Sequence, residues 1–427
     1  MEAALTHLGR KGSILTRFAL ISWRISLLAR TLTSNTSDSL QSDCMTAVEV
    51  FQTNSFPSGY WFGDSISRWK LISAQTSALP RMDLVCERRI AQLHSPLKNF
   101  ELDEQVIEHR RDPLTGRRSI VLKGRRDYVK RYIETDEQAL AETAERTRQG
   151  CPFCPEKAER STPRFPASLV PDGVIRVGEA RTFPSLFAHS EFNAVTVITD
   201  SHYVRPKELT ARILSDAIEA STRYLGVVHQ KNPDVRYGAA LVNCLPPAGS
   251  TLVHPHMQAL ASDQPFNMLA EVDLRTREYW EANRSNYWRV LIAEEKERKE
   301  RYLGSLDSSD WITAYSPTGP DEVWGVAHHA SDLTRTSPDI LSGLADGLSR
   351  VLRFYDDIGI RSFNAVVFSS PFGAESAYGS VVLKVASRYG FQSHNVNDVW
   401  GLRYFLDESE VFDSPEAIAV QLCNYFA

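Results

Sequence analysis

A strand–helix–strand–strand order occurs twice along this chain, and this repetition constrains the fold more than any other feature. In the first copy, the β-branched segment NAVTVIT (193–199) precedes an amphipathic helix at 207–230 and the strand-like segments GAALVNCL and LVHPHMQAL. The second copy has the same order, with strands at 321–329, 364–370 and 380–389 and an amphipathic helix at 338–359. We interpret this repetition as an internal duplication, in which only the first half keeps a cluster of histidines.

The N-terminal region differs from the rest of the chain. With 427 residues, the chain exceeds a typical domain of about 150 residues. The segment GRKGSILTRFALISWRISLLARTLTSNTS is basic, contains no acidic residue and is rich in Ser and Thr. This composition resembles an organellar presequence. The alternative, which we favour, is a poorly structured extension over residues 1–81 that precedes the functional protein.

The remaining sequence divides into three parts. Residues 82–265 are expected to form the N-terminal half, in which a turn at Asp112–Gly116 forms a hairpin and a polar helix covers 134–148. Residues 266–315 are expected to form a charged helical connector with a solvated face. Residues 316–427 are expected to form the C-terminal half.

Composition excludes several classes of protein. Lys and Arg number 48 against 53 Asp and Glu, a net charge of −5, which argues against a nucleic-acid-binding protein. No run of 18 apolar residues occurs, so no membrane-spanning helix is expected. Six cysteines are too few for a disulfide scaffold of this size. We therefore expect a cytoplasmic protein with no membrane partner, unless the N-terminal extension directs it to an organelle.

One pair of cysteines has the spacing of a metal site. Cys151 and Cys154 form a C-x₂-C turn, which is half of a tetrahedral zinc site. Redox motifs share this spacing, but here the turn follows a polar helix in a loop. With no second C-x₂-C motif, histidines should complete the site. His254 and His256 are candidates, and His202 is the nearest one upstream.

The segment from His254 to Gln258 carries the candidate chemistry. Alternate side chains of an extended segment face the same way, so His254, His256 and Gln258 should share one face. An imidazole is a competent nucleophile toward phosphorus at neutral pH, and a glutamine amide can donate hydrogen bonds to phosphoryl oxygens. The preceding loop at 247–251 offers backbone N–H groups and hydroxyls, and Gly249 allows a close approach to a phosphate.

These motifs together resemble the galactose-1-phosphate uridylyltransferase family, the nucleotidyltransferase branch of the histidine-triad superfamily. The pattern Asn243-x₁₀-His254-Pro-His256-x-Gln258 resembles the family's active-site signature, and CPFCPEKAERSTP resembles its zinc loop. RDPLTGRRSIVLKGRR resembles its N-terminal hairpin, and the resemblance covers about residues 100–425. It implies an α+β fold with two histidine-triad-like halves, each an antiparallel sheet with helices on one face.

The resemblance also implies a function. His256 would attack the α-phosphorus of a nucleotide sugar such as UDP-glucose, and a hexose 1-phosphate would then accept the nucleotidyl group. Gln258 would hold the phosphoryl oxygens, while a second group would bind substrate: Asn243, Gly249, Ser250, Thr251 and Arg126. The implied zinc ligands are Cys151, Cys154, His202 and His254. The partners would be a nucleotide sugar and a sugar 1-phosphate, and family members are commonly homodimers.

Departures from the family pattern keep alternatives open. The C-terminal half has Leu383-Lys384-Val385 where many members have a metal-binding histidine pair, so no second metal is expected. The nucleotide-contact segment is Phe183–Phe187 and lacks the family's asparagine, which leaves the base open. With phosphate or water as acceptor, the same histidine would make the protein a nucleotide-sugar phosphorylase, for example of an ADP-sugar, or a hydrolase. A zinc-binding scaffold without turnover is the third alternative.

Overall fold

The computed structural model of the protein describes residues 80–394 and 397–427. The predicted extension at 1–81 lies outside the described residues, apart from its last two. The described part has the mixed α+β architecture expected from the sequence, with sheets that are largely antiparallel. None of its helices is both long enough and apolar enough to cross a membrane.

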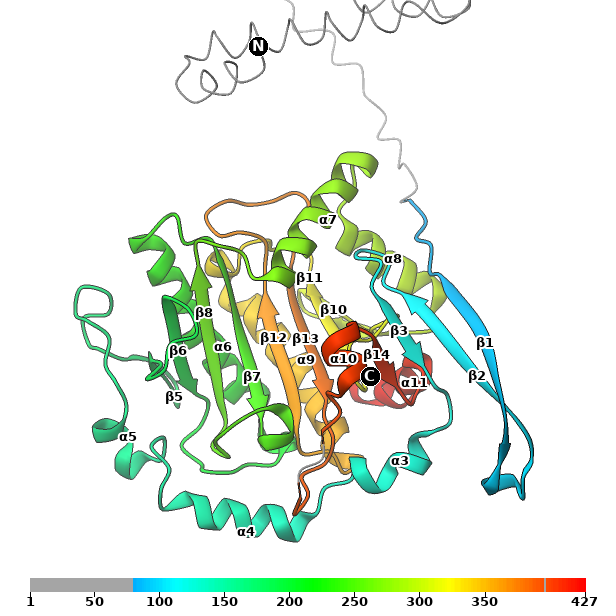
Figure 1. Ribbon diagram of the computed structural model, residues 1–427. Coiled ribbons are helices and arrows are strands. Elements are labelled where there is room, and N and C mark those ends of the chain that lie inside the picture. Colours follow the sequence, from blue (N-terminus) through cyan, green and yellow to red (C-terminus); the bar gives the residue numbers. More distant parts are fainter. Residues whose placement is uncertain (1–79, 395–396) are drawn as a thin grey trace, which may run out of the picture. The chain divides into compact units, whose positions relative to one another are not determined.

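A ten-stranded sheet forms the centre of the fold (Figure 1). All its neighbouring strands pair antiparallel. Their order across the sheet is β4 (Ile175–Val177), β5 (Ala180–Pro184), β6 (Phe192–Val197), β8 (His256–Ser262), β7 (Tyr237–Cys244), β12 (Phe363–Phe368), β13 (Val381–Ser387), β11 (Val323–Ala327), β10 (Ser309–Thr313) and β9 (Tyr302–Leu306). Pairing between β7 and β12 joins the strands of the two segments expected to be copies of each other into one continuous sheet.

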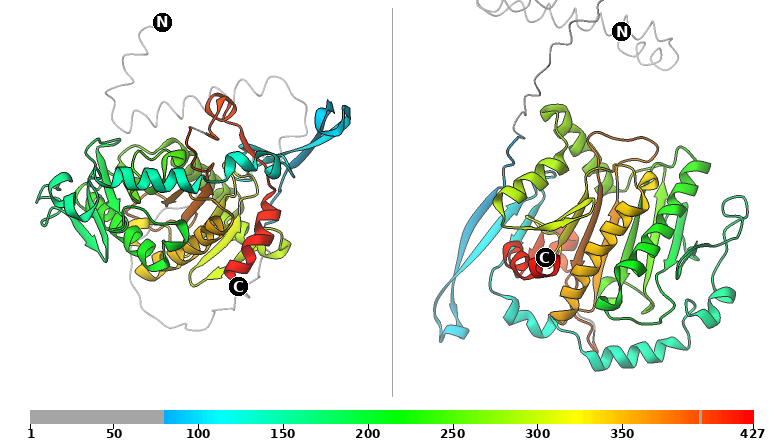
Figure 2. Two further views of the ribbon diagram at one scale, coloured as in Figure 1. Left: turned by 90° about the horizontal axis from the view of Figure 1, so that it is seen from below. Right: turned by 180° about the vertical axis from the view of Figure 1, so that it is seen from behind.

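Two long helices cover one face of this sheet. They are α6 (Ala211–Lys231) and α9 (Pro338–Asp357), which pack together behind the strands (Figures 1 and 2). Thr210 caps α6 by accepting a hydrogen bond from the Ile213 N–H, and Pro338 begins α9 with its backbone already suited to a first turn. The apolar faces of both helices lie in the main core, so the opposite face of the sheet remains for the site.

The connector between the two halves is helical but not simply solvated. It forms α7 (Asn267–Asn283) and α8 (Tyr287–Arg298), and it also includes β9 and β10. The charged end of α8 is solvated as expected, since Lys296 and Arg298 are exposed. Its other face is not, because Trp288, Leu291 and Ile292 are buried in a second core against the open face of β10 and β11. The charged run at 294–300 begins in the last turns of α8. Because of this run, the apolar face is not evident from the sequence.

The segment before residue 122 forms a separate sheet with the C-terminus. Its strands are β1 (Cys86–Ser95), β2 (Glu101–Arg111), β3 (Arg118–Val121) and β14 (Ser409–Val411), and β14 pairs parallel to β3. The expected hairpin turn is present, since the Asp112 carboxylate accepts bonds from the N–H groups of Leu114 and Thr115. The smaller helices are α3 (Arg126–Ile133), α4 (Glu137–Arg148), α5 (Pro155–Ser161), α10 (Gly401–Leu406) and α11 (Pro415–Phe426), with 3₁₀ turns at Pro96–Lys98, Pro206–Glu208, Pro246–Ala248 and Leu333–Arg335.

A buried ion network ties this small sheet to α11. The Glu416 carboxylate accepts hydrogen bonds from Arg110 at 2.8 and 2.9 Å and from Arg301 at 2.7 Å. The Tyr315 ring lies 5.1 Å from the Arg110 guanidinium and 5.0 Å from that of Arg301. Burial alone would raise the pKa of Glu416, but the two arginines lower it to about 2.

We expect Glu416→Gln to lower the free energy of unfolding by about 2–3 kcal/mol at neutral pH, because it leaves two buried arginines short of a charge partner. The ordinary pKa of Glu416 is 4.5 and the folded value is about 2, so its contribution is complete above pH 4.5 and is lost as the pH falls toward 2. Urea unfolding at several pH values measures both effects. The control Glu278→Gln breaks an exposed pair on α7 and should cost less than about 1 kcal/mol. Equal losses in the two variants would contradict this role of Glu416.

Candidate active site

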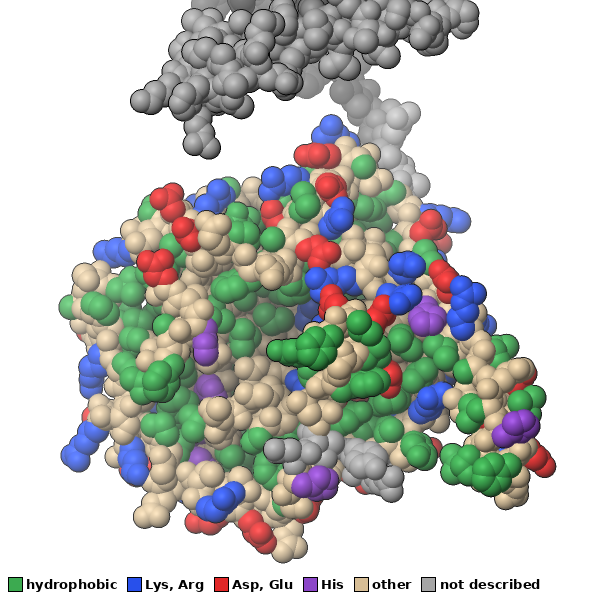
Figure 3. Space-filling model, in the orientation of Figure 1, with side chains coloured by type: hydrophobic (Ala, Val, Ile, Leu, Met, Phe, Trp, Pro, Cys, Tyr) green, Lys and Arg blue, Asp and Glu red, His purple; other side chains and the backbone are tan. Residues whose placement is uncertain are grey.

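The candidate site lies on the open face of the sheet at the start of β8. The strand β8 pairs with β6 on one side and with β7 on the other. Gln258 of β8 lies opposite Val195 of β6 and Leu241 of β7. Along β8, Met257 and Ala259 are buried against the helices, whereas His256 and Gln258 are half-buried on the other face. The expectation that His254, His256 and Gln258 share one face is met for His256 and Gln258 by the backbone pleat, whereas His254 lies before the strand, in the buried cluster with the cysteines. Figure 3 views the molecule from this side and shows hydrophobic side chains over the middle of the face.

The ring of His256 is held in one orientation. Its Nδ1 lies 2.9 Å from the His254 carbonyl oxygen, which can only accept, so Nδ1 carries the proton. Its Nε2 has no hydrogen-bond partner among the described residues and keeps its lone pair. Burial lowers the pKa of His256, although the bond to the His254 carbonyl opposes this, so the ring is neutral at pH 7. The Phe153 ring lies 5.3 Å from that of His256 and fixes it from one side.

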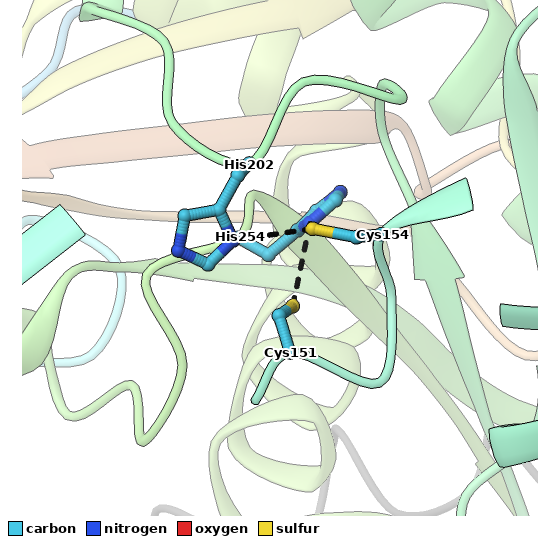
Figure 4. A group of neighbouring side chains, drawn as sticks. All are labelled: Cys151, Cys154, His202 and His254. Carbon is cyan, nitrogen blue, oxygen red and sulfur yellow. Dashed lines mark hydrogen bonds between the residues drawn. The ribbon is translucent and has the colours of Figure 1, made fainter. Parts of the chain in front are cut away.

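Four buried side chains converge next to β8 (Figure 4). Cys151, Cys154, His202 and His254 each offer one ligand atom, and these atoms lie within 4.8 Å of one another. The Nδ1 of His254 is 3.6 Å from both sulfur atoms, and the Nδ1 of His202 is 3.5 Å from the Cys154 sulfur. The four residues named from the sequence as metal ligands therefore form one Cys₂His₂ cluster.

The outer nitrogens of both histidines are already bonded. The Nε2 of His254 donates to the Thr199 carbonyl at 2.8 Å, and that of His202 lies 3.1 Å from the Thr147 hydroxyl. The Thr147 hydroxyl in turn donates to the Thr143 carbonyl at 2.8 Å, so its oxygen can accept from His202. Burial lowers the pKa of His254 to about 4, which keeps its ring neutral. Both rings thus present an unprotonated Nδ1 to the sulfurs, as metal-binding histidines do.

A second polar group crosses the junction between the two halves. Asn243 on β7 lies directly opposite Asn364 on β12, and the Asn364 amide donates to the Asn243 oxygen at 2.7 Å. The Asn364 oxygen accepts from Arg388, which Asp398 holds at 2.8 Å. Sequence reasoning named Asn243 but not Asn364 as a site residue. The Asn-Ala-Val sequence at 193 and again at 364 indicated the strand that contains Asn364. It did not indicate that Asn364 would contact Asn243.

The loop before β8 is structured by its own bonds. Gly249 has φ of 90°, in the left-handed region that favours glycine, and its N–H donates to the Pro246 carbonyl at 2.9 Å. The Ser250 N–H donates to the Leu245 carbonyl, and the Ser250 hydroxyl donates to the Leu252 carbonyl at 2.7 Å. Thr251 is exposed. Phosphate binding through the N–H groups of Gly249 and Ser250 would therefore have to compete with these internal bonds.

Arg126 lies in an ion-pair group of its own. It begins α3 and contacts Asp321 at 2.8 Å and Asp413 at 2.7 Å, and both carboxylates belong to the C-terminal part of the chain. Burial would lower its pKa, but these two carboxylates hold it above the ordinary value. The structure brings Arg126 into no hydrogen bond or ion pair with the described residues of the His256 group. Its part in substrate binding remains a prediction from the resemblance.

One known protein resembles this chain in sequence, and several solved structures resemble it in fold. An uncharacterized protein of Archaeoglobus fulgidus is 30% identical over 336 residues, which are 78% of this chain and 97% of that protein. No protein-family model matches the sequence. A GalT-like protein of Arabidopsis thaliana has a TM-score of 0.57, and an ADP-glucose phosphorylase from the same plant, solved with ADP-glucose, has one of 0.58. Each is 16% identical, and each match covers 74% of this chain and 98% of that one.

The fold defines the class: an α+β protein with the architecture of a uridylyltransferase. A solved uridylyltransferase is 16% identical with a TM-score of 0.54, over 65% of this chain and 91% of that one. The chain shares a family with the A. fulgidus protein. Its fold is that of the GalT-like protein, the ADP-glucose phosphorylase and the uridylyltransferase among these solved structures.

The Cys₂His₂ cluster should hold one metal ion in each chain. We expect Cys154→Ser to lose the bound metal and to lower the melting temperature, because one of four ligands is removed next to β8. Elemental analysis of the purified protein, with thermal unfolding, measures both. The matched control is Cys244→Ser, since Cys244 is also buried but lies outside the cluster. Equal metal content in the two variants would show that the cluster does not bind metal.

Proposed function

We propose that this protein transfers a nucleotidyl group between a nucleotide sugar and a hexose 1-phosphate, as in UDP-glucose–hexose-1-phosphate uridylyl transfer, through a nucleotidyl-histidine at His256. The observation that carries the proposal is the orientation of His256. Its Nδ1 is bonded to the His254 carbonyl, and its Nε2 is unprotonated beside Gln258 on an open face. A neutral, fixed imidazole with a free lone pair is a nucleophile that needs no separate base.

The chain's own residues account for the steps. The His256 Nε2 would bond to the α-phosphorus, and the bond from that phosphorus to the bridging oxygen would break. The electron pair leaves with the sugar 1-phosphate. The ring then carries a positive charge, which the Nδ1–H bond to the His254 carbonyl stabilises. A second sugar 1-phosphate oxygen attacks the phosphorus, breaks the N–P bond and restores the neutral ring.

We propose that the Cys₂His₂ cluster binds zinc. Tetrahedral zinc with S and N ligands at about 2.3 and 2.0 Å would separate sulfur from nitrogen by about 3.5 Å, close to the 3.5–3.6 Å between these atoms. Zinc would supply structural cross-linking rather than chemistry. It would join the Cys151–Cys154 turn to the residues just before β8 and so support the position of His256.

We also propose that the two halves arose by duplication. The strand order supports this: adding five to each label turns β4-β5-β6-β8-β7 into β9-β10-β11-β13-β12, which is the other half of the sheet in reverse. The helices α6 and α9 follow β6 and β11, the third strand from the edge in each half. The halves would then cover about 175–262 and 302–387, with β1–β3 and β14 outside the repeat.

A second candidate keeps His256 and changes the acceptor to phosphate or water. Two observations favour this second candidate. The ADP-glucose phosphorylase of Arabidopsis has the same fold, with a TM-score of 0.58. The Phe183–Phe187 segment also lacks the asparagine that the family resemblance led us to expect at the base. The nucleotide base and the acceptor are therefore the two properties that the experiment must separate.

Covalent trapping tests the proposal directly. Protein incubated with α-³²P-labelled UDP-glucose or ADP-glucose should acquire an acid-labile, base-stable label, because phosphoramidates on histidine hydrolyse in acid. His256→Gly should abolish the label, whereas the control His94→Ala, at an exposed histidine on β1, should keep it. Chasing the label with glucose 1-phosphate, inorganic phosphate or buffer alone identifies the acceptor. No label with any nucleotide sugar, or an undiminished label in His256→Gly, would refute the covalent mechanism.

Gln258 should affect the rate of labelling rather than its extent. We expect Gln258→Ala to slow label formation about 10²- to 10³-fold, the usual loss for one donor to a developing phosphoryl charge. Rapid-quench measurement of the labelling rate checks this. Gln264→Ala removes a glutamine amide just beyond the end of β8 and serves as the matched control. A rate unchanged in Gln258→Ala would remove Gln258 from the mechanism.

A further inference from the structure

A cavity of about 390 Å³ lies on the same open face of the sheet, over the C-terminal half. Its floor comes from β7, β12, β13 and β11, and its wall is largely apolar, with Leu241, Val366, Trp288 and Trp324 among its members. We call it the side cavity. Its volume falls in the range of pockets that bind small organic molecules. Asn243, which the family resemblance assigns to substrate binding, is among the residues that line it, but none of the bond-making steps described above takes place in it.

Ion pairs hold the rim of the side cavity together. Arg117, from the hairpin turn, contacts Glu271 of α7 at 2.9 Å and Asp407, just after α10, at 3.2 Å. Arg403 of α10 contacts the same Asp407 at 2.9 Å. Segments distant in sequence therefore enclose the cavity. The charges of Arg117 and Arg403 at the rim are neutralised by carboxylates.

Lys384 is the exception among the cavity's cations. Its Nζ lies 3.8 Å above the centre of the Trp324 ring, and no carboxylate of the described residues lies within 4.0 Å of it. The nearby Glu322 is already bonded, since it accepts from the Trp324 indole N–H at 2.6 Å and from the Thr318 hydroxyl at 2.9 Å. A half-buried ammonium at an apolar wall without a counter-ion is suited to an anionic ligand.

We propose that the side cavity binds an organic phosphate with a flat aromatic body, in which the phosphate contacts Lys384 and the ring packs against the apolar wall beside Trp324. The aromatic body follows from the largely apolar wall, because polar side chains of the lining such as Asn243, Asn364 and Glu322 are already bonded within the protein. The choice of phosphate over carboxylate rests on the proposed function, whose substrates are all phosphate esters.

This site is separate from the covalent step. One row of paired residues crosses the sheet, from Gln258 to Leu241, Val366 and Lys384. Three strand spacings separate β8 from β13, which is about 14 Å. A phosphate held by Lys384 is therefore too far from His256 to react with it, and the side cavity binds its ligand without turnover.

Calorimetric titration of the His256→Gly protein with 1-naphthyl phosphate tests the proposal, since covalent chemistry is absent in that variant. One molecule should bind each chain, and 1-naphthol, which lacks the charge, should bind at least tenfold more weakly. AMP and UMP should compete for the site. Glucose 1-phosphate should not compete, because it lacks an aromatic body.

Variants at the cavity locate the binding. Lys384→Met should weaken 1-naphthyl phosphate at least tenfold, Lys384→Arg should retain it, and Val366→Trp should block it by filling the cavity. Lys296→Met is the matched control, because Lys296 also lies over a ring, that of Tyr302, but pairs with Asp310 outside the cavity. Melting temperatures establish that each variant is folded.

The outcomes are distinguishable. Equal affinity in Lys384→Met and the parent would overturn the proposal, and so would competition by glucose 1-phosphate as strong as that by AMP. Failure of covalent labelling with normal, Lys384-dependent binding of 1-naphthyl phosphate would refute the nucleotidyl transfer and leave the side cavity intact.

Discussion

Backbone pairing of β8 with β6 and β7 is the constraint on which the candidate site depends. The side-chain period of a strand is two, so a slip of one residue would turn His256 and Gln258 into the core and bring Met257 to the open face. Several contacts oppose such a slip. Met257 and Ala259 are buried on the helix side, and His254, just before the strand, is fixed by the Thr199 carbonyl and by the two cysteines. The candidate metal cluster and the sheet register thus support the same ring orientation.

Local patterns in the sequence were sufficient for the parts of the fold that depend on neighbouring residues. The strand at β6, the helices α6 and α9, and the Cys₂His₂ set followed from periodicity, spacing and resemblance. The parallel pairing of β14 with β3 joins residues 119 and 409, and no local signal encodes it. The buried face of α8 was missed because its last turns carry Glu and Lys, while Trp288 and Ile292 pack against a distant sheet. Pairing partners far apart in sequence account for both failures.

The residues of the candidate site also divide into those that local sequence could predict and those that only the pairing of distant strands brings together. His256 and Gln258 lie two residues apart on one strand, so their shared face could be predicted from an extended backbone. Asn364 and Arg388 enter the polar group next to Asn243 only because β12 lies beside β7. Arg126 shows the opposite case: the resemblance placed it near the nucleotide, but its two carboxylate partners, Asp321 and Asp413, hold its side chain in a different ion-pair group.

Charge distribution explains how a chain of net charge −5 could suit the anionic substrates proposed for it. Most arginines near the open face are neutralised: Arg117 and Arg403 by Asp407, and Arg388 by Asp398. Among the described residues of this face, the groups that remain to meet a phosphate are a neutral imidazole, an amide and, across the sheet, the Lys384 ammonium, which has no carboxylate partner. In a half-buried setting such single groups interact more strongly than a diffuse surface charge does, because less solvent screens them. Affinity would then be concentrated at two places on one face, so the overall charge of the protein places little constraint on its ligands.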